Sequence, residues 1–269
     1  VCGISEKELR TDFQEDVQAL ADVGKMTLED AFLKLKEWYD GYHFVANGTD
    51  IYNPFSLLNT FASCEFGNYW FETGTPTFLV ELLKKSHYDL RRLTDEVAMA
   101  DSLTGIDSVP DNPVPYLYQS GYLTIKGYNK EFQVYELGFP NKEVAEGFTK
   151  FLLPSYAHLS SGNSAFELMS FVKDVREGNV DSFMRRLQSF FADTSYELAR
   201  DLELHYQNVL FIVFKLMGFY TQVEYHTSQG RVDLVLKTDR YIYVMEFKLD
   251  GTVEEALRQI EEKDYTRPF

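Results

Sequence analysis

Residues 229–248, QGRVDLVLKTDRYIYVMEFK, carry the pattern that indicates how the C-terminal part of this chain folds. Residues 231–237 and 241–247 are apolar segments rich in β-branched and aromatic side chains, and the polar sequence Thr238-Asp239-Arg240 separates them. Such a pattern predicts a β-hairpin with a turn of about three residues.

Charged residues at the open end of this hairpin are expected to lie close together. Side chains alternate between the two faces of a strand, so Glu246 and Lys248 share a face. The short turn puts Asp233 opposite Glu246 or within one residue of it. A divalent cation would remove the cost of burying two carboxylates there. The alternative is an ordinary hairpin with a solvated salt bridge among Asp233, Glu246 and Lys248.

A strongly apolar helix is expected before the hairpin. Residues 209–217 are all apolar except Lys215, so this helix should be buried on nearly every side. Glu203 lies on the same helical stripe as Tyr206 and Leu210. A carboxylate there needs a compensating partner, which could be a metal ion, a core arginine or the Tyr206 hydroxyl.

A second helix is expected after the hairpin, beginning at the capping sequence Thr252-Val-Glu-Glu255. Gln259 lies along one edge of its apolar stripe, from which it can reach a site at the margin of the sheet. The expected core stripe of this helix consists of Val253, Ala256, Leu257 and Ile260.

The segments GRVDLVL, YVMEFKLDG and EEALRQIEEKDY resemble the PD-(D/E)xK nuclease superfamily, and in particular nuclease domains fused behind an AAA-ATPase-like domain in many bacterial proteins. The resemblance implies that Asp233 and Glu246 ligate Mg²⁺ or Mn²⁺. It also implies that Lys248 positions or activates the attacking water, and that Gln259 supports the site. The segment ELHYQ resembles the helix motif of the superfamily, which implies that Glu203 is a further acid.

The segments WYDGYHF, IYNPFSLL, YWFETGT and SGYLTI resemble the lid-side, C-terminal part of the AAA-ATPase-like domain. No Gly-x-x-x-x-Gly-Lys-Ser/Thr sequence occurs, so ATP is an expected partner only if an ATPase core lies upstream of Val1. Residues 122–128 and 132–137 predict a second hairpin after a helix that ends at Gly121, which suggests a winged-helix element. The other helices are expected at 27–38, 54–63, 77–93, 141–156, 165–177 and 180–192, with connecting segments at 107–115 and 158–164. The first of these begins with a capping-box-like sequence, Thr27-Leu-Glu-Asp30, and Asn53-Pro54 opens the second.

These patterns predict an α+β chain in three parts. Residues 1–155 form a mostly helical, winged-helix-like lid part, residues 156–194 a helical linker, and residues 195–269 a restriction-endonuclease-like core of order α-β-β-β-α. This core ends before the strand expected after its last helix. The exposed strand edge is expected to stay open or to contact a neighbouring molecule, such as a second copy of the chain.

Composition limits the possible partners. The formal net charge of −16 at pH 7 opposes nucleic-acid binding, which depends on cations that neutralise phosphates. Residues from Ser195 onward carry only 13 of the 42 acidic residues and 9 of the 26 basic ones, so most of the excess lies earlier in the chain. The most basic segment contains Lys84, Lys85, Arg91 and Arg92, which form either a phosphate-contacting face or a solvated helix surface.

No apolar run approaches the roughly 18 residues of a membrane span. Two cysteines in a chain of this size suit a reducing cytoplasm.

Two functions are therefore expected. The first is a metal-dependent nuclease that acts on DNA or RNA through the Asp233, Glu246 and Lys248 site, and hard oxygen ligands favour Mg²⁺ or Mn²⁺ for it. The alternative is a catalytically silent module that binds protein or nucleic acid. The net charge favours the alternative, and the intact set of site residues favours the enzyme.

Overall fold

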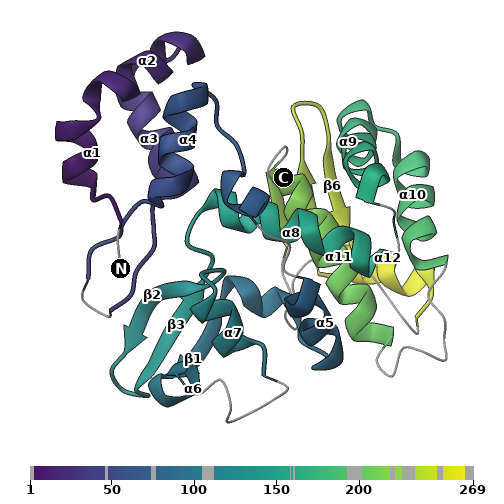
Figure 1. Ribbon diagram of the computed structural model, residues 1–269. Coiled ribbons are helices and arrows are strands. Elements are labelled where there is room, and N and C mark those ends of the chain that lie inside the picture. The colour runs from purple at the N-terminus through teal and green to yellow at the C-terminus, as the bar shows by residue number, and fades with distance from the viewer. Residues whose placement is uncertain are drawn as a thin grey trace. The chain divides into compact units, whose positions relative to one another are not determined.

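The structure is a computed structural model, which describes residues 3–45, 48–73, 77–104, 112–157, 159, 161–192, 202–218, 222–225, 234–246 and 251–263. It confirms the predicted α+β class (Figure 1). The chain divides into two compact units, Val1–Phe148 and Thr149–Phe269. The expected functional division at residues 155 and 194 stays a prediction.

The first unit consists of α1 (Glu6–Asp12), α2 (Gln14–Gly24), α3 (Leu28–Tyr39), α4 (Pro54–Ser63), the 3₁₀ helix η1 (Tyr69–Thr73), α5 (Thr77–Lys85), the 3₁₀ helix η2 (Leu90–Thr94), β1 (Glu96–Met99), α6 (Ala100–Thr104), α7 (Val114–Gln119), β2 (Thr124–Asn129), β3 (Val134–Gly138) and the start of α8 (Lys142–Tyr156). The second unit consists of the remainder of α8, α9 (Ser161–Glu177), α10 (Val180–Ala192), α11 (Leu202–Gly218), β4 (Gln222–Tyr225), β5 (Leu234–Lys237), β6 (Ile242–Met245) and α12 (Val253–Glu262).

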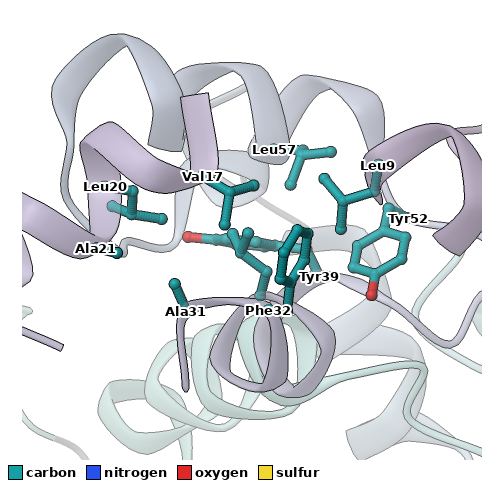
Figure 2. Packing of buried hydrophobic residues seen from close by; sticks show 10 residues of the cluster. Leu9, Val17, Leu20, Ala21, Ala31, Phe32, Tyr39, Tyr52 and Leu57 are labelled. Atoms are coloured by element: carbon teal, nitrogen blue, oxygen red, sulfur yellow. The ribbon is translucent and has the colours of Figure 1, made fainter. Parts of the chain in front are cut away.

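Helices α1 to α4 form the N-terminal core. Their starts follow local chemistry: Thr27 and Asp30 form the predicted capping box of α3, and Asn53 caps α4 ahead of Pro54. Figure 2 shows the buried side chains that these helices share, which include Leu9, Val17, Leu20, Ala21, Ala31, Phe32, Tyr39, Tyr52 and Leu57. The large apolar area that they bury holds the four helices together.

The middle of the first unit contains an antiparallel sheet of order β1-β3-β2. The predicted second hairpin is confirmed as β2 and β3, whereas the expected helix over residues 77–93 is wrong. That helix ends at Lys85 because His87 adopts a left-handed conformation, with φ of 49°. Asp89 then caps η2, and β1 follows as a strand that the sequence analysis missed.

Helices α9, α10 and α11 form an aromatic core in the second unit. Phe171 packs edge-on against Phe183 and Phe190, with ring centroids 5.3 Å apart in both pairs, and Phe183 also stacks on Phe214. As predicted, residues 209–217 of α11 are buried except for Lys215, which is partly exposed. The connecting segment expected at residues 158–164 is shorter than predicted, because α9 already begins at Ser161.

The second sheet has the order β4-β5-β6, with antiparallel pairs throughout. It confirms the predicted hairpin, whose turn is held by the Thr238 hydroxyl, since this oxygen accepts from the Arg240 and Tyr241 amides. The Tyr243 hydroxyl donates to the Val175 carbonyl at 2.7 Å and so ties β6 to α9.

Candidate functional site

Glu246 directly follows β6, at the end of the described ladder between β5 and β6. The last described pair of this ladder joins Leu234 to Met245, and the preceding pairs include Val235 with Val244. The Glu246 side chain is half-buried at this position. The sheet therefore presents one carboxylate at the end of the hairpin that is remote from the turn.

Helix α12 brings Gln259 to this carboxylate. Ile260, the next residue, packs against the buried Val235 of β5, and this contact orients the helix on the sheet. The Gln259 Nε2 atom then donates a hydrogen bond of 2.5 Å to Glu246 Oε1. This contact between two sequence-predicted site residues holds the carboxylate in one orientation, which is how outer partners of metal ligands act.

The start of α12 follows the predicted capping box. The Thr252 hydroxyl accepts from the Glu255 amide, and the Glu255 carboxylate accepts from the Thr252 amide. The predicted core stripe is wrong at Val253 and Leu257, which are 71% and 55% exposed. Ala256 and Ile260 are half-buried, so the helix turns this part of the stripe inward and leaves Val253 and Leu257 facing outward.

The other predicted site residues cannot be placed in the same way. Asp233 and Lys248 lie outside the described residues. Glu203 lies in the first turn of α11, but its side chain is also outside the described part. Among the described residues there is no group of three or more His, Cys, Asp or Glu side chains that could hold a metal ion. The carboxylate of Glu246 is a hard oxygen group, of the kind that Mg²⁺ and Mn²⁺ prefer.

The basic segment of the first unit is not a free cationic face. Arg91 forms two hydrogen bonds of 2.7 and 2.6 Å with the Asp89 carboxylate, and Arg92 pairs with Glu96 at 2.6 Å. Burial lowers the pKa of Lys84. Arg91 and Lys84 are thus paired or buried, whereas Arg92 pairs with Glu96 but keeps a side chain that is 55% exposed. The segment therefore does not form a continuous cationic face for a phosphate backbone.

A buried acid that was not predicted from the sequence, Glu143, lies in the first turn of α8. Its side chain is fully buried, and its Oε1 atom accepts hydrogen bonds of 2.9 Å from the Ser56 hydroxyl and from the Trp70 amide. Burial raises the pKa of Glu143 to about 7. The sequence does not indicate that Glu143 is buried, because a glutamate in the first turn of a helix is usually an exposed partner of the helix dipole.

The C-terminal residues 201–269 match the PD-(D/E)XK nuclease superfamily. The matched region contains α11, the sheet of β4, β5 and β6, and α12, and it supports a nuclease-type fold for this part of the chain. Nucleases of this superfamily usually use divalent metal ions.

The chain as a whole is similar to an "Uncharacterized protein in vnfD 5'region" from Azotobacter chroococcum mcd 1. The two are 32% identical over 247 residues, which cover 88% of this chain and 47% of that protein. The chain thus spans about half the length of this relative. No solved structure matches the chain significantly. None of the described helices is long and apolar enough to cross a membrane.

Proposed function

We propose that the C-terminal part of this chain, residues 195–269, is a metal-dependent nuclease that hydrolyses phosphodiester bonds in DNA or RNA. The observation that carries the proposal is the hydrogen bond from Gln259 to Glu246. A glutamine on the last helix and a glutamate at the end of a hairpin strand are two of the residues that the nuclease interpretation requires together.

The rest of the site follows from the register of the hairpin. Continuing the ladder by one residue beyond the pair of Leu234 and Met245 would put Asp233 opposite Glu246. Both carboxylates would then ligate Mg²⁺ or Mn²⁺, and Glu203 on α11 is a further proposed ligand. Lys248, two residues after Glu246, would share its face of the strand.

Each residue has a distinct proposed role. A bound divalent cation would act as a Lewis acid on the phosphate. The lysine ammonium of Lys248 would orient the attacking water or stabilise the charge that develops on the phosphate oxygens. Gln259 is a positioning residue, because it acts through the orientation of Glu246. This hydrogen bond holds the metal ligand before the substrate arrives.

A second candidate function is a binding module with an inactive site. Two observations favour it: the net charge of −16 and the ion pairs that occupy Arg91 and Arg92. In this case the chain would bind a protein partner or nucleic acid without cleaving it. We further propose that the protein is bacterial and cytoplasmic, and that ATP is a partner only if an ATPase core lies upstream of Val1.

Titration with Mg²⁺ and Mn²⁺, followed by a cleavage assay on single- and double-stranded DNA and RNA, tests the proposal. The wild type should bind metal by calorimetry and gain thermal stability, as with any ligand of the native state. Asp233→Ala and Glu246→Ala should abolish both effects. Lys248→Ala should keep metal affinity within a few-fold and reduce cleavage by about 10² or more.

The outcomes separate the two functions. Metal binding without cleavage by the wild type would favour the binding module. Absence of metal binding, or equal binding by wild type and both alanine variants, would remove the basis for a nuclease site.

A further inference from the structure

A pocket of about 530 Å³ lies along the edge of the first sheet, in the Val1–Phe148 unit and apart from the proposed nuclease site. Its walls come from the chain after α5, from η2, β1 and α6, and from the start of α7; the labels of α5, β1, α6 and α7 mark this region in Figure 1. The volume is within the range of about 300–1,000 Å³ that is typical of small-molecule sites.

The polar end of the pocket is built around Glu96, which is fully buried. Its carboxylate accepts hydrogen bonds from the Tyr88 hydroxyl, from Arg92 Nη2 and from the Val97 amide. Burial raises the pKa of Tyr88, so this hydroxyl stays protonated and keeps donating. With three donors, the carboxylate is already compensated and has little capacity to attract a cation.

Arg92 differs from Glu96, because their contact occupies only part of the guanidinium. The Glu96 carboxylate holds its Nη2 atom at 2.6 Å, while the Arg92 side chain remains 55% exposed. A guanidinium has five N–H donors in a rigid fork, and the contact with Glu96 uses one of its nitrogens. Arg92 and Glu96 are the charged residues that line the pocket among those described. The ion pair with Glu96 fixes the position of the Arg92 guanidinium, which is therefore preorganised to bind an oxyanion.

Apolar side chains of β1 also line the pocket. Val97 and Met99 alternate with buried residues along β1 and are 51% and 64% exposed. Two exposed apolar side chains beside a fixed guanidinium suit a ligand that has an apolar body and an anionic head. Burying such surface on binding is favourable in proportion to its area.

An extended peptide that adds to the edge strand fits less well. β1 is an outer strand of its sheet, but side chains already occupy part of its polar backbone. The Val97 amide donates to Glu96, and the Ser102 hydroxyl donates to the Met99 carbonyl at 2.7 Å. Such capping reduces the capacity of an edge to pair with another strand.

We propose that this pocket binds a small organic anion, with its oxyanion head on Arg92 and its apolar body against Val97 and Met99. The inference does not depend on the nuclease activity. It assigns a ligand class to the first unit, where the sequence analysis expected either a phosphate-contacting face or a solvated helix surface.

Fluorescence titration with 8-anilinonaphthalene-1-sulfonate tests this proposal, because the probe combines a sulfonate with an aromatic body. Met99→Glu should weaken probe binding by about fivefold or more through like-charge repulsion. Phe132→Glu is the matched control, since Phe132 is 65% exposed in the turn between β2 and β3 and does not line the pocket. Arg92→Lys keeps the charge beside Glu96 but loses the fork, and should also weaken binding.

Arg91→Lys is the control for the second variant, since Arg91 pairs with Asp89 away from the pocket. The uncharged analogue N-phenyl-1-naphthylamine lacks the sulfonate head group. Arg92→Lys should therefore leave the binding of this analogue unchanged. The proposal is overturned if the wild type does not bind the sulfonate probe, or if Met99→Glu and Phe132→Glu have equal effects. It also fails if Arg92→Lys weakens both probes equally. Preferential binding of amide-capped extended peptides would indicate strand addition at β1 instead.

Discussion

At the scale of single residues, the contact between Gln259 and Glu246 is the described part of the proposed metal site. The hydrogen bond of 2.5 Å joins a helix residue to a residue that follows a strand, 13 positions apart in the sequence. Sequence analysis placed both residues in one site because a helix edge can reach the margin of a sheet. The sequence does not give the distance, since that depends on how Ile260 packs against Val235.

Gln259→Ala should lower the affinity for Mg²⁺ or Mn²⁺ by about 10- to 100-fold, because the carboxylate of Glu246 loses the partner that orients it. Isothermal titration calorimetry measures the affinity directly. Arg258→Ala on the same helix is the control, since the Arg258 side chain is 68% exposed and pairs with Glu262. Equal affinities of Gln259→Ala and wild type would show that the hydrogen bond does not support a metal ligand.

Glu143 leads to a prediction about pH. Its pKa is about 7 in the folded chain, above the ordinary value of 4.5 that applies when the chain is unfolded. A raised pKa means that the contribution of this group to stability is fully present below about pH 4.5 and is lost as the pH rises through about 7. The neutral isostere Glu143→Gln should therefore gain stability relative to wild type between pH 5 and pH 8, by at most about 3 kcal/mol.

Urea unfolding of both proteins at several pH values measures this difference. Glu143→Gln keeps an oxygen that can accept from the Ser56 hydroxyl and the Trp70 amide. Glu15→Gln, an exposed change on α2, serves as the control for loss of one charge. A difference between wild type and Glu143→Gln that is constant across this pH range would contradict the raised pKa.

At the scale of elements, the sequence predicted most helix bounds to within a residue, and it failed mainly at the end of α5 and at the start of α9. The starts of α3, α4 and α12 were predicted from Thr27, Asn53 and Thr252, whose side chains cap the first turn. The end of α5 was not predicted, because the left-handed conformation of His87 has no sequence signature comparable to glycine. Strand β1 was missed for a related reason. It has only four residues, and its pairing with β3 is non-local.

The cap of α12 gives a prediction at this scale. Thr252→Ala should destabilise the helix by about 1 kcal/mol and also weaken metal binding, since Gln259 reaches Glu246 only if the helix is formed. Thr27→Ala removes an equivalent capping box from α3 in the other unit, so it should cost similar stability without changing metal affinity. Thermal unfolding and calorimetry on both variants provide the comparison. If the two variants bind metal with equal affinity, the cap of α12 does not affect the metal site.

At the scale of the whole molecule, charge is the strongest constraint on function. The net charge of −16 opposes nucleic acid, and the arginines at positions 91 and 92 are held in ion pairs. The charge can be read from the sequence, but the ion pairs of these arginines with Asp89 and Glu96 are seen only in the structure. Bound metal ions would offset acidic charge locally. The effect of metal ions on nucleic-acid binding can be measured separately from cleavage.

Neutralising the proposed metal ligands should change nucleic-acid binding in a way that depends on metal. In EDTA, the double variant Asp233→Asn and Glu246→Gln should bind single-stranded DNA more tightly than wild type, because two negative charges near the phosphates are removed. With Mg²⁺ the order should reverse, since only the wild type can hold an ion between carboxylates and phosphate. Fluorescence anisotropy with labelled DNA at constant ionic strength measures both conditions.

The control removes the same charge elsewhere. Glu15→Gln with Asp16→Asn changes two exposed acids of α2 and alters the net charge equally. If only the site variant gains affinity in EDTA, the phosphate backbone lies at Asp233 and Glu246, as the nuclease requires. If both double variants gain equally, the gain comes from overall charge, and DNA does not contact the hairpin. If only the α2 variant gains affinity for DNA, with or without Mg²⁺, the first unit binds the nucleic acid. That result would favour the binding module.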